Sequence, residues 1–229
     1  PYTTLFRSEP QQADGGRAQR EVDQREEHRE VQHGVAPGFC GGAVAFGVAA
    51  LDLDPDSALA LTMLGNVHTS FLRDLDRAEM LYDQALSQNP NESLAWLQKG
   101  NALSFRGDGD GALHHTTRAV ALSPLDPSRH FYLGIQASAA LTAEDYPRAV
   151  EAARAALRMN HAHLSAHRVL VIALAMSGRL DEARASARRL LSLDPTLCVA
   201  DYVAQSPGAA SGLAGRAQEL QRAVGAFKL

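Results

Sequence analysis

The first residues that could carry chemistry form the run Asp-Gly-Asp-Gly from Asp108 to Gly111, which has the alternating spacing of a calcium-binding loop. Such a loop needs a third oxygen ligand and a closing glutamate that holds the ion with both of its oxygens. The residues at those two places are Ala112 and Ala119, which supply no ligand. The pattern therefore predicts a turn between helices and no calcium site.

A second candidate is the histidine cluster His161, His163 and His167. His163 and His167 are four residues apart, a spacing that can place two metal ligands on one face of a helix. His167 falls on a packing position, and no cysteine or carboxylate lies near it in the sequence. We therefore expect structural or exposed histidines and predict no metal.

Patterns typical of catalysis are missing from the sequence. It contains no G-x-S-x-G elbow, P-loop or Rossmann glycine pattern, and neither Cys40 nor Cys198 has a histidine at a patterned spacing. We predict that this chain is not an enzyme and binds no cofactor. Two cysteines fit a reducing, cytoplasmic compartment. A net charge of −4 argues against direct binding of nucleic acid.

Small residues recur at a nearly constant interval, which indicates an internal repeat. Their intervals are 35, 34, 37 and 34 residues for the series Ala43, Ala78, Ala112, Ala149 and Ala183. Glycines repeat in the same register, and so do prolines that follow Asp, Asn or Ser; they are Gly65, Gly100, Gly134, Pro55, Pro90, Pro124 and Pro195. The composition agrees, because 45% hydrophobic residues with only 6% aromatic ones favour thin helix-on-helix packing.

These markers resemble the tetratricopeptide repeat, whose unit of 34 residues carries a Leu-Gly pair, two alanines and a closing proline. The best matches are Leu64-Gly65, Ala78, Tyr82, Ala85 and Pro90 in one unit, and Leu133-Gly134, Ala149 and Ala156 in another. The sequence departs from the pattern at three positions: Lys99 replaces the Leu before Gly100, Val171 replaces the Gly, and Thr116 stands where an aromatic residue is usual. The resemblance implies an all-α fold, a right-handed superhelical solenoid of antiparallel helix pairs.

The repeat register predicts four helix pairs. They are 58–72 with 75–88, 93–105 with 109–122, 127–141 with 145–158, and 164–177 with 180–193. Asp126 and Pro127 are typical of a helix start. A half unit precedes the pairs, with an unpaired helix at 43–53. Its expected partner, about 24–38, lacks the apolar pattern.

Four segments divide the chain. Residues 1–8 match the in-frame translation of a widely used sequencing adaptor, so we interpret them as an artefact and expect a fragment of a longer protein. Residues 9–42 read as a disordered or degenerate lead-in. The array runs over 43–197, as a half repeat at 43–57 and repeats at 58–92, 93–126, 127–163 and 164–197. The stretch 198–229 reads as capping helices, because Leu213, Ala217, Leu220, Val224 and Phe227 follow helical spacing.

The resemblance also implies a concave groove lined by the first helix of each pair, where a protein or peptide would bind. The groove positions carried over are Thr62, Asn66, Leu97, Gln98, Asn101, Phe105, Phe131, Tyr132, Ile135, Arg168, Ile172 and Met176. Asn66 and Asn101 stand where chaperone-binding relatives hold a peptide carboxylate. Thr62 and Leu97 replace the lysines of that clamp, so chaperone-tail binding is disfavoured. For Phe131 and Tyr132, packing between helices is an equal alternative.

Charge is divided along the array. Residues 51–92 hold eight acidic and two basic residues, whereas 148–193 hold eight arginines and three acidic residues. This division permits self-association through ends of opposite charge, although charge runs more often only solvate a surface. No membrane contact is expected. The uncharged stretch 34–51 approaches the length of a membrane span, but five glycines and Pro37 interrupt it.

The sequence therefore predicts a protein–protein interaction scaffold, which we interpret as part of a bacterial multidomain signalling protein. Residues 123–127, 178–184 and 201–207 resemble the C-terminal repeat regions of two such classes. One alternative is the regulatory C-terminal region of a class III nucleotide cyclase. The other is the C-terminal region of a winged-helix DNA-binding transcriptional regulator.

Overall fold

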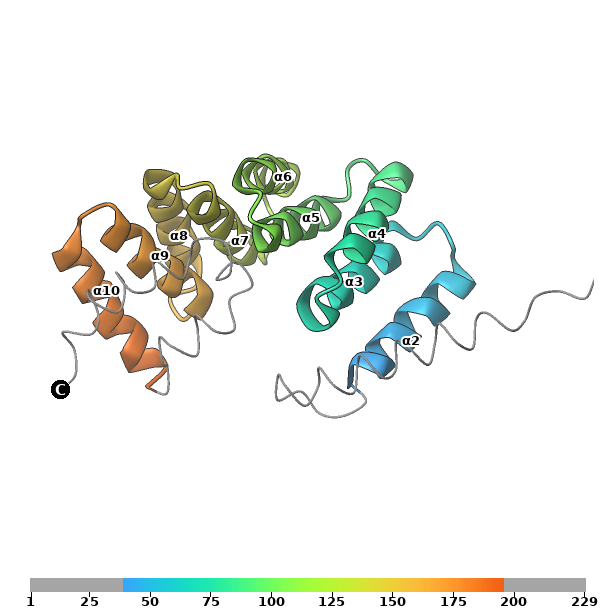
Figure 1. Cartoon of the computed structure of the whole chain (residues 1–229), viewed down its shortest axis with the longest axis horizontal. Helices are drawn as coiled ribbons and strands as arrows, with labels where there is room; N and C mark the ends of the chain where they lie inside the picture. The colour runs from blue at the N-terminus through green and yellow to red at the C-terminus, as the bar shows by residue number, and fades with distance from the viewer. Residues whose placement is uncertain (1–38, 196–229) are drawn as a thin grey trace, which may run out of the picture.

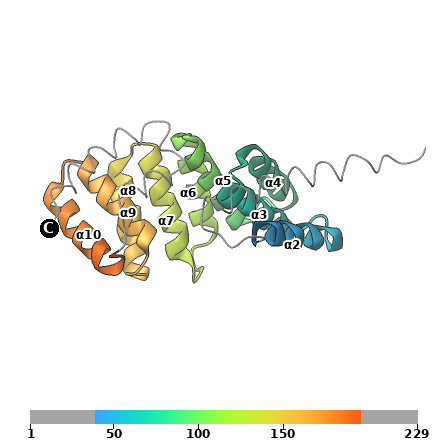
Figure 2. The same ribbon diagram turned by 60° about the horizontal axis from the view of Figure 1, so that its bottom comes forward.

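The computed structural model describes residues 39–195, which form a succession of helices. Figure 1 shows them stacked side by side in a curved row with α2 and α10 at opposite ends, and Figure 2 shows the same row from a second direction. The elements are α2 (Phe39–Leu53), α3 (Ala58–Val67), the π-helical turn η1 (His68–Leu72), α4 (Leu75–Gln88), α5 (Ser93–Arg106), α6 (Gly109–Leu122), α7 (Arg129–Thr142), α8 (Tyr146–Met159), α9 (Leu164–Met176) and α10 (Leu180–Leu193). The predicted fold class, a helical solenoid, is confirmed for this part of the chain.

Several predictions concern residues outside this range. They are the artefact at 1–8, most of the lead-in at 9–42, and the capping helices at 198–229 with Cys198. Between residues 39 and 195, the structure contains no helix that is both long enough and apolar enough to cross a bilayer.

Consecutive helices pack as four pairs, α3 with α4, α5 with α6, α7 with α8, and α9 with α10. We call the four pairs units one to four, and the two helices of a unit helix A and helix B. Most helix ends lie within two residues of the prediction. The start of α7 is a correction, because Asp126 and Pro127 stay in a turn. The Asp126 carboxylate accepts a hydrogen bond from the Ser128 backbone N–H at 2.7 Å, and the helix begins at Arg129.

Small residues lie where the two helices of a unit cross, as the markers predicted. Ala78, Ala112 and Ala149 are fully buried. A Cβ added to Gly65 would lie 2.6 Å from Cε1 of Tyr82, so only glycine lets α3 approach α4 this closely. The fourth marker, Ala183, is also buried, and it shares with Ala149 one core cluster that spans units three and four.

Aspartates start three of the B helices. The carboxylates of Asp74, Asp108 and Asp145 each accept a hydrogen bond from the backbone N–H three residues later, at 2.9–3.1 Å. This N-capping satisfies a backbone donor that the helix itself leaves unpaired. The Asp-Gly-Asp-Gly run is thus the start of α6, in agreement with the predicted turn.

Two units are longer than 34 residues, and each absorbs its extra residues differently. In each unit, the glycine position of the Leu-Gly pair precedes a residue of left-handed conformation in the turn. The separation is seven residues in units two (Gly100 to Gly107) and four (Val171 to Gly178). It is eight in unit one (Gly65 to Arg73) and ten in unit three (Gly134 to Glu144). In unit one the extra residue is absorbed by the π-helical turn His68–Leu72. In unit three, α7 continues for eight residues after Gly134, whereas α5 continues for six after Gly100.

Candidate partner-binding groove

The A helices form a continuous inner layer. Each of α3, α5 and α7 packs against the A helix of the next unit. Figure 1 shows α6, a B helix, on the outer side of the curve and α5 beneath it. The A helices therefore line the concave side, where the sequence predicts the groove.

The predicted groove residues divide into two groups. Five have buried side chains: Thr62, Leu97, Gln98, Tyr132 and Ile172. The other seven are half-buried or exposed: Asn66, Asn101, Phe105, Phe131, Ile135, Arg168 and Met176. Only the second group offers appreciable surface to a ligand.

The buried group connects helices to one another. Leu97 packs with Ala119 and Tyr132 in one core cluster. The Tyr132 hydroxyl is also 3.2 Å from the hydroxyl of Ser93, which joins α7 to α5. Of the two adjacent aromatic residues, Tyr132 therefore belongs to the packing and Phe131 is exposed. The packing alternative therefore describes Tyr132, and Phe131 stays a predicted groove residue.

The predicted groove positions of units one and two that remain accessible include polar side chains. The Asn66 carboxamide oxygen accepts a hydrogen bond from the Ser70 hydroxyl at 3.0 Å. Among the described residues none forms a hydrogen bond with the side-chain amide of Asn101. The guanidinium of Arg73 lies 5.1 Å from the centre of the Phe105 ring, which is the geometry of a cation–π contact. This half can donate and accept hydrogen bonds and also offers an aromatic surface.

The predicted groove positions are more apolar in units three and four, where Phe131, Ile135 and Met176 are accessible. The guanidinium of Arg168 lies 3.4 Å from the carboxylate of Asp194, so the fourth unit carries an ion pair beside this surface. Apolar side chains of a partner would lose water-exposed area by packing here. The two halves together suit a ligand with both backbone amides and apolar side chains.

The histidine cluster stabilises the junction of units three and four. Nδ1 of His163 accepts a hydrogen bond from the Ala166 backbone N–H at 3.2 Å and so caps α9. The ring of His130 lies 5.5 Å from that of His163 in an edge-to-face arrangement. Burial, together with the nearby His130, lowers the pKa of His163. His167 instead contacts the backbone carbonyl of His161 at 2.9 Å.

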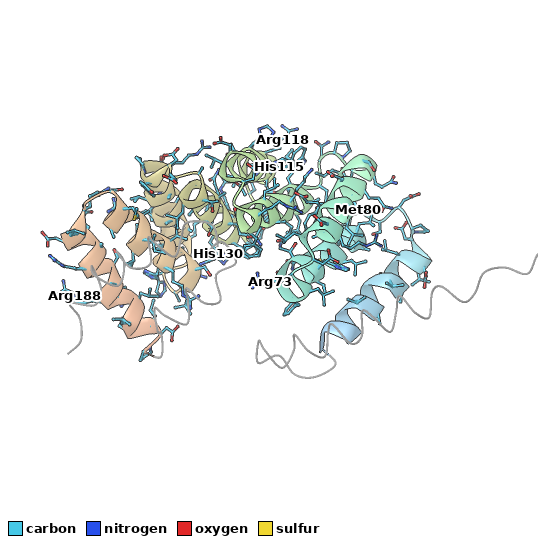
Figure 3. All side chains as sticks on the ribbon, in the orientation of Figure 1. Arg73, Met80, His115, Arg118, His130 and Arg188 are labelled. Atoms are coloured by element: carbon cyan, nitrogen blue, oxygen red, sulfur yellow. The ribbon has the colours of Figure 1, made fainter. Side chains whose placement is uncertain are left out.

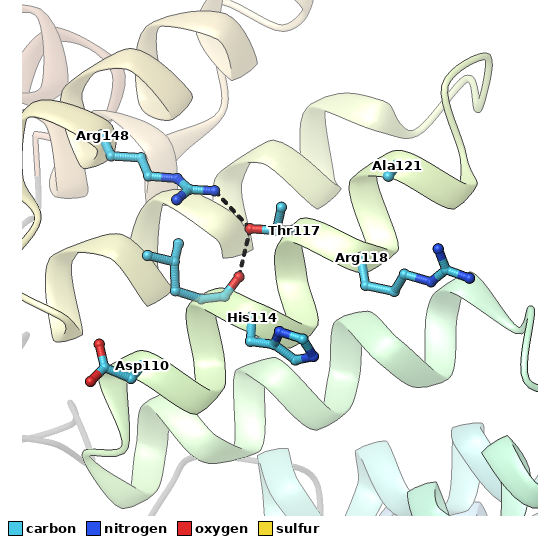
Figure 4. Close-up of a pocket in the computed structure, with 7 residues that line it drawn as sticks. Asp110, His114, Thr117, Arg118, Ala121 and Arg148 are labelled. Carbon is cyan, nitrogen blue, oxygen red and sulfur yellow. Dashed lines mark hydrogen bonds between the residues drawn. The ribbon is translucent and has the colours of Figure 1, made fainter.

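A second surface lies between two B helices and has no signal in the sequence. It is a hollow of about 500 Å³ between α6 and α8, lined by Asp110, Leu113, His114, Thr117, Arg118, Ala121 and Arg148 (Figure 4). Arg148 donates a hydrogen bond to the Thr117 hydroxyl at 2.8 Å. The lining residues come from two different units, so only the stacking of units brings them together.

A curved stack of antiparallel helix pairs, with small residues at each crossing and the A helices lining the inner side, defines the chain as a helical repeat protein. Residues 136–197 match the family model of the tetratricopeptide repeat. The resemblance that the repeat markers predicted is thereby confirmed for residues 136–197.

Solved structures share this fold at low sequence identity. PilW, a widely conserved type IV pilus biogenesis factor, aligns with a TM-score of 0.65 and 19% identity over 93% of this chain and 94% of its own. Pseudomonas aeruginosa pilF aligns with a TM-score of 0.62 and 16% identity, over 94% of both chains. YrrB, a tetratricopeptide protein with an unusual peptide-binding site, gives 0.54 and 20% identity over 79% of this chain and 92% of its own. No curated protein matches the sequence.

Proposed function

We propose that this chain is a protein-interaction module that binds a peptide or a partner domain in its concave groove. The observation that carries the proposal is a line of accessible side chains on three successive A helices. They are Asn66, Asn101, Phe105, Phe131 and Ile135. YrrB, which shares the fold, is named for its peptide-binding site, and this supports the proposal. We assign no catalytic role to the chain.

The two halves of the groove suggest how such a ligand would lie. The amide of Asn101 has a donor and an acceptor, which matches the backbone of an extended peptide. Phe131 and Ile135 would pack against an apolar side chain further along the ligand. At the positions where a carboxylate clamp would need cations, Thr62 and Leu97 are neutral and buried. We therefore expect a ligand recognised by its backbone and apolar side chains.

We further propose that the array serves a bacterial signalling protein. The support is the resemblance of residues 123–127 and 178–184 to C-terminal repeat regions of cyclases and winged-helix regulators. The gene region upstream of this sequence would show paired metal-binding aspartates in the first case. It would show a winged helix in the second.

The groove is tested with a random peptide library displayed on phage and selected on the full chain. Peptides that bind are labelled, and their affinity is measured by fluorescence anisotropy for wild type and variants. Phe131→Ala should weaken binding by about tenfold or more, as expected for a partly exposed aromatic anchor. Asn101→Ala should weaken it less, by the value of one hydrogen bond, about 1 kcal/mol.

Leu125→Ala is the matched control, because Leu125 is an exposed apolar residue in the turn between α6 and α7. This variant should bind as wild type does. Selected peptides that bind all three variants equally well would place the binding site elsewhere on the molecule.

A further inference from the structure

At one set of equivalent positions, the residue at the N-terminal end of the array is far more exposed than its three counterparts. Met63 in α3 corresponds to Gln98 in α5, Tyr132 in α7 and Val169 in α9, by the intervals of the repeat. Met63 is 49% exposed, whereas each of the other three is 5% exposed or less. Those three are buried because each A helix packs on the A helix before it. Within residues 39–195, no A helix precedes α3 to cover Met63.

The same comparison holds for α2, which is a B helix that no described A helix precedes. Phe46 corresponds to Leu81, His115 and Ala152 in the following units. Leu81 and Ala152 are buried, and His115 lies against Trp96 of α5 with ring centres 5.2 Å apart. Phe46 is 79% exposed. This position is normally covered by the A helix of its own unit.

Both comparisons point to the place of one A helix, which lies before α2 and is not among the described residues. Helix α5 touches His115 of its own unit and Tyr132 of the next, which are the equivalents of Phe46 and Met63. A single A helix placed before α2 would therefore cover Phe46 and Met63 together. Leu59, which is also exposed, precedes Met63 by one turn on the same side of α3. We call Phe46, Leu59 and Met63 the end face.

The residues that directly precede α2 are poorly suited to cover the end face. In the repeat register, Glu27 and Glu30 stand where Leu61 and Leu64 stand in unit one. Leu61 and Leu64 are buried. Burying unpaired carboxylates at these positions would cost several kcal/mol each.

Another segment of the sequence has the required pattern. From Leu213 to Phe227, apolar residues recur once per helical turn over 15 residues, about the length of an A helix. Arg216, Arg222 and Lys228 exceed the single acid Glu219 in this region. The end of the array that carries the end face is acidic, with eight acidic and two basic residues over 51–92. The two surfaces are complementary in both hydrophobicity and charge.

We propose that the end face binds the segment Leu213–Phe227 of a second copy, so that chains associate end to end. A second copy is favoured because α2 and α10 lie at opposite ends of the row (Figure 1), and the segment follows α10 in the chain. Such a contact joins two different surfaces, so each added copy leaves a free end face and a free segment. The assembly therefore grows by further copies unless the copies close into a ring. This association leaves the groove of each copy open to a ligand.

Two variants of the full chain test the proposal, one on each side of the junction. Met63→Glu places a charge on the end face at a position exposed enough to tolerate it in the free chain. Leu220→Glu places a charge in the middle of the segment. Sedimentation velocity of the wild type should show dimers and larger species that grow with concentration and diminish with added salt. Each variant alone should lose these species and sediment as a monomer.

The decisive sample is an equal mixture of the two variants. The Met63→Glu copy keeps an intact segment and the Leu220→Glu copy keeps an intact end face, so one junction can form. The mixture should therefore give dimers and nothing larger. Met80→Glu is the matched control, because Met80 (labelled in Figure 3) is a 61% exposed methionine on α4, whereas the end-face residues belong to α2 and α3. It should assemble as wild type does.

Three results would overturn the proposal. A wild type that stays monomeric at every concentration would mean that copies do not join. Continued association of Leu220→Glu would mean that two end faces pair with each other without the segment. A mixture of the two variants without dimers would exclude an unlike-ends junction. Circular dichroism of each variant confirms that the helices are retained.

Discussion

The hydroxyl groups of Thr69 and Tyr82 form a fully buried hydrogen bond of 2.8 Å between η1 and α4. Thr69 has one hydroxyl proton and donates it to the Gly65 carbonyl at 3.1 Å. Tyr82 must therefore be the donor to Thr69. Burial raises the pKa of Tyr82 well above its usual value near 10, so the phenol stays protonated and keeps this role.

This direction of donation makes the two single substitutions unequal. Tyr82→Phe removes the donor, but the Thr69 hydroxyl still has its backbone partner, so the expected cost is about 0.5–1.5 kcal/mol. Thr69→Val leaves the buried Tyr82 hydroxyl with no partner, at a cost of about 1–3 kcal/mol. The double variant has no orphaned hydroxyl. It should be about as stable as Tyr82→Phe, which gives a coupling energy equal in size to the cost of Thr69→Val, about 1–3 kcal/mol.

Urea unfolding measures these differences through circular dichroism and the fluorescence of Trp96, the one tryptophan of the chain. Thr142→Val is the matched control, since the Thr142 hydroxyl donates only to the Ser138 backbone carbonyl. It should change stability by no more than about 0.5 kcal/mol. The reasoning fails if Tyr82→Phe costs more than Thr69→Val, or if the double variant costs their sum.

Three further predictions follow from single contacts. Gly109→Ala would place a Cβ 2.4 Å from the backbone of Ala143 and should lower the free energy of unfolding in urea by about 1–3 kcal/mol. Gly42→Ala is its control, because the added Cβ meets nothing within 4 Å and should raise that free energy by up to about 1 kcal/mol; equal effects of the two substitutions would refute this packing. Gln98→Met removes a buried carboxamide oxygen that has no hydrogen-bond partner among the described residues and should stabilise the chain by about 1 kcal/mol, while a loss would show that the amide is satisfied. Neutral His163 contributes stability that is complete above the unfolded-state pKa near 6.5, and this stability is lost as the pH falls from there toward the lowered folded-state pKa. Thermal unfolding measured against pH should show this loss. His163→Asn, which can cap α9 but does not titrate, should reduce the pH dependence.

The helices could be predicted because the markers report backbone proximity. Ala112 lies at a crossing of two helices, where a larger side chain would separate them. Such a requirement depends on the fold of each unit and recurs with it, so the spacing alone located the pairs. The start of α7 was misplaced because Asp126 and Pro127 suit a tight turn as well as a helix start.

The groove was harder to predict, because neighbouring residues on one helix can have opposite environments. Phe131 and Tyr132 are both aromatic and lie about 100° apart around α7. Residue type does not indicate which of the two is buried. Burial depends on the neighbouring unit, where Tyr132 contacts Ser93 and packs with Leu97. The hollow between α6 and α8 was missed for the same reason. Contacts between units are not encoded in any one repeat.

The two long units explain why the array tolerates irregular repeats. Adding one residue to an α-helix turns everything after it by about 100°, which would move the buried face of α4 away from its partner. The π-helical turn His68–Leu72 removes that rotation by widening one turn. Three added residues come within about 60° of a full turn, so α7 extends without such a device. The number of inserted residues thus decides whether a repeat lengthens a helix or widens a turn.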